Sequence, residues 1–458
     1  MLFHMSKIIK LLILYQSDGI ISESNRFIRP FAEMANKGHI VHLIYTGKIT
    51  FPHNMLLHRV RKVAFPVISS IPFLVQSFLV ASNIMKRNDI EIFLCYREED
   101  ILIGWLLKKI WRKISIVYYA HGDSITIQGL ISKKIIDKIK YSISIILEKI
   151  MLPKVDLVIA VSKDTKLRIM RRTCIPSDKI VVVYNNVLPA STHTVPFMYE
   201  LKKSNKRIIG YVGHFSELKN IQILLQAFLL LSKEIDDLIL VLVGDGPLRA
   251  ELEKFVRKNS LENKVIFTGW VRNPLDYMQY FDVLVHPSLY EGCPSVILEA
   301  FSLNVPVIGS KAGGIPELLK YEELLFQPLD YLELANKLKI LLSCHEKYFQ
   351  TKKLIEERKR VFTFDHVAII EELLKNISIK SAYRASKNGY MLTFNQRARL
   401  LRGVPFLERL GRYCSGTPSP TRELLRFPIG LATVSALRAL ENTRSSSSSF
   451  EPSLLGWR

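Results

Sequence analysis

Short apolar runs that alternate with longer amphipathic stretches constrain the fold of this chain more than any other feature. The first half contains the runs Ile8–Leu14, Ile40–Tyr45, Ile90–Cys95, Ile116–Ala120, Leu157–Val161 and Ile180–Val183. The second half contains the runs Arg207–Val212, Leu238–Val243, Val265–Thr268, Val283–Val285 and Val305–Ile308. Strand-like runs separated by helical stretches are typical of parallel α/β sheets. The pattern therefore predicts an α/β protein.

The length of the chain indicates two domains. A chain of 458 residues with 48% hydrophobic residues can bury two ordinary cores. Residues 188–206, which contain prolines, serines and threonines, separate the two sets of runs. We therefore predict Rossmann-like domains at residues 1–187 and 207–360, joined by a linker at 188–206. Paired domains of this kind bind their ligands in a central cleft, at the carboxyl ends of the strands.

The last part of the chain has a different composition. From Ser381 onward Lys387 is the only lysine while arginines abound, and the chain ends in Ser445–Ser449 and a short segment with proline. Because this part lacks strand and helix periodicity, we predict that residues 381–458 are a disordered, Arg- and Ser-rich appendage.

The cysteines and the start of the chain indicate a cytoplasmic protein. The five cysteines are Cys95, Cys174, Cys293, Cys344 and Cys414, and they show no C-x-x-C pairing. This pattern argues for a reducing compartment and against a disulfide framework or a zinc site. Met1–Gln16 is apolar but lacks a small-residue cleavage site, so we expect a buried strand there and no signal peptide.

The net charge of +22 raises the question of an acidic partner. Nucleic acid is not expected, because the chain has no aromatic-basic RNA signature and no helix-turn-helix or zinc-finger spacing. An anionic membrane surface is the second candidate, since Lys133–Lys149 mixes lysines with Ile and Leu as a basic amphipathic helix does. Lys108, Lys109, Arg112 and Lys113 form another basic cluster in the same half. A packed helix with solvated lysines remains open as the alternative.

A constellation of polar residues occurs between Asp282 and Leu319. Glu291 and Glu299 stand eight positions apart, in a loop that leads into a helix. Pro294 suits the first position of that helix, because its missing N–H costs nothing there. The backbone amides near Ser295 and Val296 would then face an anion at the helix start. This arrangement suits a nucleotide diphosphate-sugar.

Three further loops carry polar or glycine-rich turns after predicted strands. Gly213, His214 and Lys219 lie in the segment that follows the run RIIGYV. Gly244 and Gly246 belong to a Gly-Asp-Gly-Pro turn after the run LILVLV, and His121 follows the run that ends at Ala120.

Taken with their flanks, these motifs resemble the retaining glycosyltransferases of the GT-B fold, the large E-x7-E family of group 1 and family 4. His-Pro-Ser before Glu291, Gly292 after it, and the turn Gly313–Glu317 all fall where this family has them. The resemblance implies transfer of a sugar, with retention, from a UDP- or GDP-linked donor to a lipid-linked glycan acceptor. Bacterial cell-surface polysaccharide or lipopolysaccharide synthesis is the implied setting, on the inner face of the plasma membrane. It also implies a cross-over helix at residues 361–380.

The resemblance also assigns roles to residues. His121, Lys219 and Glu291 are the expected catalytic residues. The expected donor-binding residues are Gly19, Gly213, His214, Gly244, Gly246, Gly292, Cys293, Ser295, Val296 and Glu299. There is no Asp-x-Asp motif, so neither a metal nor a cofactor is expected.

Two departures from the family pattern leave alternatives open. His214 replaces the arginine that forms a two-cation clamp on the diphosphate, and Gly19 lacks the usual neighbouring glycine. The chain could instead be a GT-B-shaped nucleotide-sugar epimerase, which would release free nucleotide without an acceptor. It could also be a catalytically inactive subunit that binds a nucleotide-sugar.

Overall fold

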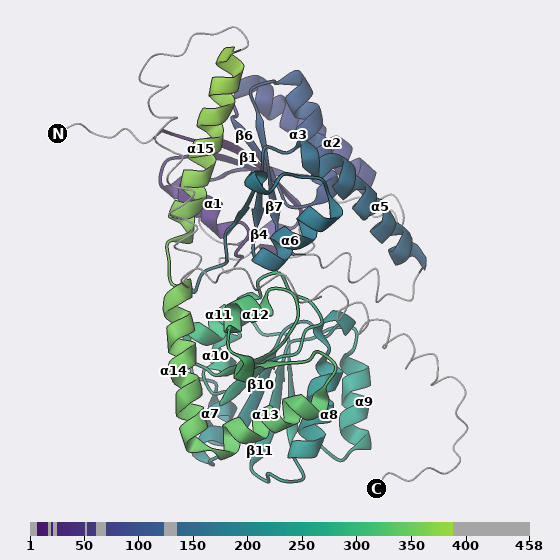
Figure 1. Cartoon of the computed structure of the whole chain (residues 1–458), viewed down its shortest axis with the longest axis vertical. Helices are drawn as coiled ribbons and strands as arrows, with labels where there is room; N and C mark the ends of the chain where they lie inside the picture. The colour runs from purple at the N-terminus through teal and green to yellow at the C-terminus, as the bar shows by residue number, and fades with distance from the viewer. Residues whose placement is uncertain are drawn as a thin grey trace, which may run out of the picture. The chain divides into compact units, whose positions relative to one another are not determined.

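The predicted apolar runs form two separate parallel sheets in the computed structural model (Figure 1). The structure describes residues 7–16, 20–21, 25–50, 53–60, 70–122 and 135–387. One unit contains the described residues up to Val187 together with those from Val361 to Lys387, and the second unit contains Leu188–Arg360. Two Rossmann-like domains with parallel sheets were predicted, and this fold class is confirmed.

The sheet of the N-terminal unit has, in its described part, the strand order β5-β3-β1-β6-β7-β8-β9, with parallel neighbours throughout. These strands are β1 (Lys10–Tyr15), β3 (Ile40–Tyr45), β5 (Leu56–Arg59), β6 (Ile92–Cys95), β7 (Ser115–Ala120), β8 (Leu157–Ala160) and β9 (Ile180–Val182), while β2 (Ile20–Ile21) pairs with β4 (Lys48–Ile49). The helices are α1 (Arg29–Asn36), α2 (Ser70–Arg87), α3 (Glu98–Ile110), α5 (Ile135–Met151), α6 (Lys163–Arg172) and α15 (His366–Lys387), with single 3-10 turns at Leu152–Lys154 and Ser177–Lys179.

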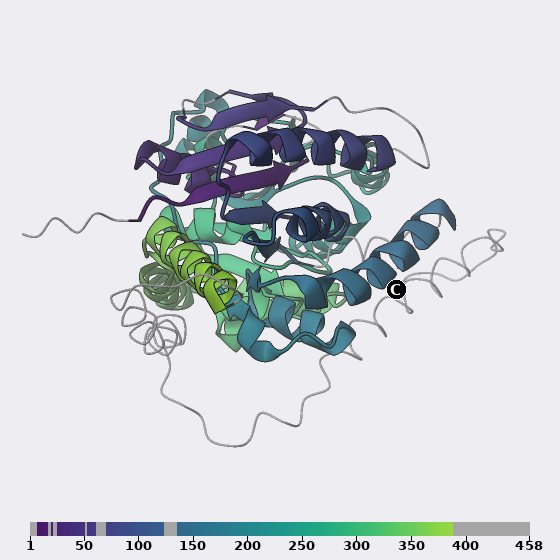
Figure 2. The same ribbon diagram turned by 90° about the horizontal axis from the view of Figure 1, so that it is seen from above.

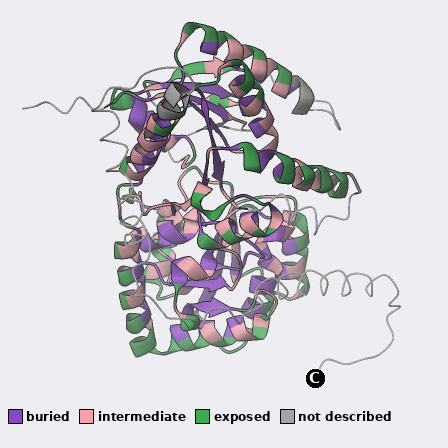
Figure 3. Ribbon diagram, turned by 45° about the horizontal axis from the view of Figure 1, so that its top comes forward, coloured by how far each residue is buried: buried purple, intermediate pink, exposed green. Residues whose placement is uncertain are grey.

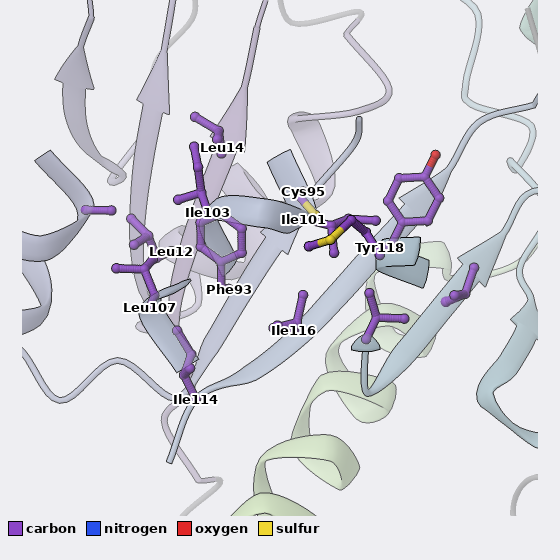
Figure 4. Packing of buried hydrophobic residues seen from close by; sticks show 14 of the residues in the cluster. Leu12, Leu14, Phe93, Cys95, Ile101, Ile103, Leu107, Ile114, Ile116 and Tyr118 are labelled. Carbon is purple, nitrogen blue, oxygen red and sulfur yellow. The ribbon is translucent and has the colours of Figure 1, made fainter. Parts of the chain in front are cut away.

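The core of this unit explains why its strands read as continuous apolar runs. A parallel strand with helices over both faces is buried on both sides, so its side chains need no polar alternation. Every residue of β6 is buried, and Phe93 packs with Leu12 of β1 and Ile116 of β7 (Figure 4). Ile103 and Leu107 of α3 cover the same cluster. None of the described helices is long and apolar enough to cross a membrane.

The helix α15 joins the N-terminal unit although it follows the second unit in the sequence. It packs along α1, and just after that helix Glu371 forms an ion pair with Lys37 at 3.6 Å and lies 3.2 Å from Nε2 of His39. The predicted cross-over helix ended at Lys380, whereas α15 continues through Lys387. The remainder of the predicted appendage lies outside the described residues.

The sheet of the C-terminal unit has the order β12-β11-β10-β13-β14-β15, again with parallel neighbours in the described residues. Its strands are β10 (Arg207–Val212), β11 (Leu238–Val243), β12 (Val265–Gly269), β13 (Val283–His286), β14 (Val307–Ser310) and β15 (Leu325–Phe326). Its helices are α7 (Pro196–Lys203), α8 (Ile221–Leu231), α9 (Arg249–Lys258), α10 (Leu275–Met278), α11 (Ser295–Ser302), α12 (Ile315–Leu319), α13 (Tyr331–Ser343) and α14 (His345–Phe362), with 3-10 turns at Glu217–Lys219 and Glu322–Leu324.

The order of these strands identifies the edge where a ligand belongs. The chain builds outward from β10 to β12 and then returns to the other side of β10 with β13, which pairs with it at Ile209 and Val283. Such a reversal is a topological switch point, and open α/β sheets bind ligands outside the carboxyl ends of the strands there. The loops that leave β10 and β13 carry Lys219 and Glu291.

The predicted linker contains a helix. Pro196 begins α7 at its first position, which suits a residue without an N–H. Met198 is fully buried, and the Lys202 ammonium lies 2.8 Å from both carboxylate oxygens of Asp282. These contacts attach the segment to the C-terminal unit.

Candidate active site

An ion pair joins the two loops at the switch point of the C-terminal unit. Lys219 ends the 3-10 turn after β10, and its ammonium contacts the carboxylate of Glu291 in the loop after β13. Next to Lys219, Asn220 has a left-handed backbone (φ 50°) and its amide donates to the carbonyl of Pro328 at 2.7 Å. Asparagine tolerates this conformation better than most residues. The turn therefore fixes the backbone position from which the side chain of Lys219 reaches Glu291.

Two more polar side chains surround Glu291. The hydroxyl of Ser288 donates to its carboxylate at 3.2 Å, and the imidazole of His286 lies 3.5 Å away. Burial raises the pKa of Glu291, but Lys219 and His286 outweigh burial and hold that pKa at about 2. Burial lowers the pKa of His286, which is therefore neutral near pH 7. Glu291 is ionised, and Lys219 supplies the opposite charge.

The turn at Gly313 and Gly314 fixes the backbone of Glu291. Gly313 has φ 56°, and a Cβ there would lie 2.1 Å from the carbonyl oxygen of Glu291. The N–H of Gly314 donates to that same oxygen at 2.8 Å. A side chain at position 313 would force the two loops apart, so this position requires glycine.

The helix α11 begins beside this pair. Pro294 was expected at the first helical position, but it is the residue just before the helix, which starts at Ser295. Amides in the first turn of a helix have no acceptor within the helix, so those of Ser295 and Val296 can bind an anion. Glu299 lies further along α11 and is half-buried, while Gly292 and Cys293 are buried in the preceding loop.

The glycine-rich loops after β10 and β11 are in direct contact. Gly244 has φ 136°, and a Cβ there would lie 1.9 Å from the carbonyl oxygen of Gly213. The N–H of Phe215 donates to the carbonyl of Asp245 at 2.9 Å, which brings the turn at Gly246 against the same loop. His214 is exposed between these contacts. The predicted residues Gly213, His214, Gly244 and Gly246 thus form one surface.

The remaining predicted residues lie elsewhere. His121 follows β7 in the N-terminal unit, where its ring stacks on Tyr119 with centroids 4.5 Å apart and an interplanar angle of 3°. The hydroxyl of Tyr119 lies 3.1 Å from Nε2 of His366 in α15. Burial, together with the nearby His366, lowers the pKa of His121 well below its usual value, so its ring is neutral at pH 7. Gly19 lies outside the described residues.

Sequence reasoning did not assign a role to several of these groups. His286 and Ser288 were noticed only as flanks of Glu291, although a buried strand that ends in polar residues is a usable signal. The contact between Tyr119 and His366 joins positions 247 residues apart, and no local pattern reports it.

Comparison with known proteins identifies the family of this chain. The family described as "Glycosyl transferases group 1" matches residues 198–358, and "Glycosyltransferase Family 4" matches residues 31–189. The chain belongs to the group 1 and family 4 glycosyltransferases. The predicted resemblance is confirmed at this level.

Named relatives of this glycosyltransferase act on different acceptors. It is 27% identical over 301 residues to N-acetyl-alpha-D-glucosaminyl L-malate synthase of Bacillus anthracis, covering 63% of this chain and 75% of that protein. It is also 27% identical over 228 residues to the Campylobacter jejuni N-acetylgalactosamine-N,N'-diacetylbacillosaminyl-diphospho-undecaprenol 4-alpha-N-acetylgalactosaminyltransferase, covering 49% of this chain and 60% of that protein.

Solved structures share the fold. The Anabaena protein HepE, crystallised with UDP and glucose, has a TM-score of 0.61 and 20% sequence identity, covering 81% of this glycosyltransferase and 99% of HepE. At this identity the likeness shows the fold alone, and the predicted GT-B fold is confirmed.

Proposed function

We propose that this glycosyltransferase transfers a sugar from a nucleotide diphosphate-sugar to a lipid-linked glycan acceptor, with retention of configuration. The setting is the synthesis of cell-surface polysaccharide or lipopolysaccharide. The observation that carries the proposal is the pairing of Lys219 with Glu291 across the switch point, next to the start of α11. This edge combines a half-buried cation with the amides at a helix start, which are the groups that bind a diphosphate.

Lys219 and α11 would act on the leaving group. Negative charge builds up on the nucleoside diphosphate as the bond to the sugar breaks, and a fixed cation lowers that barrier. In this account Lys219 meets the charge from one loop, and the amides of Ser295 and Val296 meet it from another. His214 is exposed on the neighbouring loop and would add one hydrogen bond or a second cation.

The backbone would approach the donor closely at three glycines in the loops after β10 and β11, namely Gly213, Gly244 and Gly246. In the loop that leads into α11, the backbone would approach it at Gly292 and Cys293.

The two glutamates have different roles in this account. Glu291 is ionised and its backbone is fixed by Gly314, so it can orient Lys219 and accept a hydrogen bond from a sugar hydroxyl. Glu299 would hold the ribose hydroxyls of the nucleotide, as carboxylates commonly do in nucleotide sites. His121 is neutral, so one ring nitrogen can donate to a sugar hydroxyl.

Retention would follow from attack on the face of the sugar that the leaving phosphate vacates. The departing phosphate would accept the proton of the acceptor hydroxyl, so the reaction needs no carboxylate nucleophile and no metal. The donor would be a UDP- or GDP-sugar, and the HepE complex with UDP makes UDP the first choice. The C. jejuni relative, whose acceptor is linked to undecaprenol, supports a lipid-linked acceptor. Such an acceptor would bring the enzyme to the cytoplasmic face of the plasma membrane as a peripheral protein.

A donor panel tests the proposal. Purified protein is incubated with UDP- and GDP-sugars, with and without polyprenyl-diphosphate-linked glycans, and both products are followed by mass spectrometry. We expect release of the nucleotide only when an acceptor is present, together with a glycosylated lipid. Epimerised sugar and free nucleotide without an acceptor would indicate an epimerase, and donor binding without turnover would indicate an inactive subunit. The NMR coupling constant of the anomeric proton in the product gives its anomeric configuration. The same configuration as in the donor would indicate retention.

A further inference from the structure

The helix α5 exposes an apolar stripe in the N-terminal unit. Ile139, Ile143, Ile146 and Ile150 are 53%, 51%, 55% and 52% exposed, respectively. Their spacing of four, three and four residues places them on one face of the helix. The N-terminal half of α5 projects beyond the other elements of its unit (Figures 2 and 3). Isoleucines aligned and exposed in this way mark an interaction surface, because isolated exposed apolar residues have no such alignment.

The end of α3 also exposes apolar side chains. α3 packs against α5, and its last turns expose Leu106 (37%) and Ile110 (59%). Beside them the ring of Trp105 lies 5.4 Å from the ammonium of Lys109 and 4.6 Å from that of Lys154. Tryptophan and lysine side chains of this kind favour the boundary between water and lipid. We name α5 and the α3 residues Trp105–Ile110 the isoleucine face.

Basic residues lie within the isoleucine face and next to it. Lys109, Arg112 and Lys113 are exposed at the end of α3, and Lys138, Lys149 and Lys154 are exposed on or next to α5. The one described acidic side chain of α5, Glu148, is buried and pairs with Arg172 at 2.9 Å. Among its described side chains, the charge that this face presents is therefore positive, as is the net charge of the chain at +22.

The positive charge of the isoleucine face favours an anionic membrane over a second copy of this chain as its partner. A second copy of this chain would bring lysines against lysines, and like charges at an interface cost several kcal/mol unless they are separated. An anionic bilayer offers both an apolar layer for the isoleucines and negative headgroups for the lysines.

We propose that the isoleucine face lies on an anionic membrane, with the α5 isoleucines at the boundary between headgroups and acyl chains. The inference rests on the proposed function, because a lipid-linked acceptor is presented at such a surface.

Vesicle sedimentation tests this inference. The full chain is mixed with phosphatidylcholine vesicles, with or without phosphatidylglycerol, at low and at high salt. We expect binding only to the vesicles with phosphatidylglycerol, and weaker binding at high salt. In the variant Ile139→Ser/Ile143→Ser/Ile146→Ser, we expect vesicle affinity to fall at least tenfold. Replacing the equally exposed Leu332 and Ile340 of α13 by serine is the matched control and should leave binding unchanged.

The outcomes separate this inference from the proposed function. Equal binding by the triple variant and the wild type, or equal binding to both kinds of vesicle, would overturn the membrane assignment. A change from dimer to monomer in the triple variant, with vesicle binding unaltered, would instead assign the face to a second copy. Transfer to a short soluble acceptor should be the same in the triple variant and the wild type. If neither protein shows transfer while the loss of vesicle binding holds, only the proposed function fails.

Discussion

At the scale of single residues, Glu299 is the clearest test of the proposed donor contacts. Glu299→Gln keeps the size of the side chain but removes the charge-assisted hydrogen bonds to a ribose, which are worth roughly 1.5–3 kcal/mol. We expect donor affinity, measured by calorimetry, to fall about tenfold to a hundredfold. Glu234→Gln, which changes an exposed glutamate paired with Lys339, is the control. Unchanged affinity in Glu299→Gln would remove this residue from the donor site.

The ionised carboxylate of Glu291 should contribute to the stability of the folded protein as well as to the site. Its pKa is lowered to about 2 in the folded state, so the ion pair stabilises the protein above the unfolded pKa of about 4.3. That contribution, on the order of 3 kcal/mol, is lost as pH falls through the folded value near 2. Glu291→Gln should therefore lower the free energy of unfolding at pH 7, and the difference from wild type should shrink between pH 5 and pH 3. Urea denaturation at these pH values gives the free energy of unfolding of both proteins. If the difference in this free energy between them stays constant with pH, the pairing of Glu291 with Lys219 is contradicted.

The sequence identified candidate residues at the switch point but not the contacts between them. Lys219 and Glu291 stood out because each follows a strand in a recognisable motif. Their ion pair joins residues 72 positions apart, and only the pairing of β10 with β13 brings the two loops together. The contact between Tyr119 and His366 could not be predicted for the same reason. His366 lies in α15, which packs on the N-terminal unit although it follows the C-terminal unit in the sequence.

At the scale of elements, we expect His366 to make the attachment of α15 sensitive to acid. Burial lowers the pKa of His366 to about 4, from an ordinary value near 6.5. Because the unfolded state binds the proton more tightly, the stability present above pH 6.5 is lost as pH falls toward 4. The loss at pH 5 amounts to about 2 kcal/mol. His366→Gln can still bond the hydroxyl of Tyr119 but cannot be protonated.

Hydrogen exchange of α15 checks this prediction. In wild type, we expect faster exchange of the amides of α15 at pH 5 than at pH 7, after correction for intrinsic rates. In His366→Gln the dependence on pH should be weaker. Equal pH dependence in the two proteins would show that another group controls the attachment of the helix.

The elements themselves were predicted unevenly. The ends of β10 and β11 agree with the apolar runs to the residue, because both are central strands buried on both faces. β5 was missed because three of its four residues are exposed, and β15 because it has only two residues. The helix α7 was hidden in a segment that reads as a linker, since its prolines and threonines suggest an irregular chain. Edge and connecting elements depend on neighbours that a local pattern does not contain.

At the scale of the whole molecule, the two units share a topology but differ in the chemistry at their switch points. In both sheets the chain builds to one side of the first strand and then returns to the other side. The C-terminal unit has an ion pair and glycine turns at this edge, whereas the N-terminal unit has the rings of Tyr15, Tyr96 and Tyr119. The charged edge suits a diphosphate, and aromatic faces suit a sugar or another neutral group. We therefore assign the donor to the C-terminal unit.

Donor binding by the Lys219→Ala variant tests this assignment most directly. Calorimetry compares wild type, Lys219→Ala and the control Lys339→Ala for the UDP- or GDP-sugar that the wild type binds best. Thermal unfolding without ligand shows that each variant is folded. We predict that Lys219→Ala loses at least tenfold in affinity for the nucleotide-sugar, while Lys339→Ala binds as wild type does. Wild-type affinity in a folded Lys219→Ala protein, or no binding of any nucleotide-sugar by the wild type, would contradict the account.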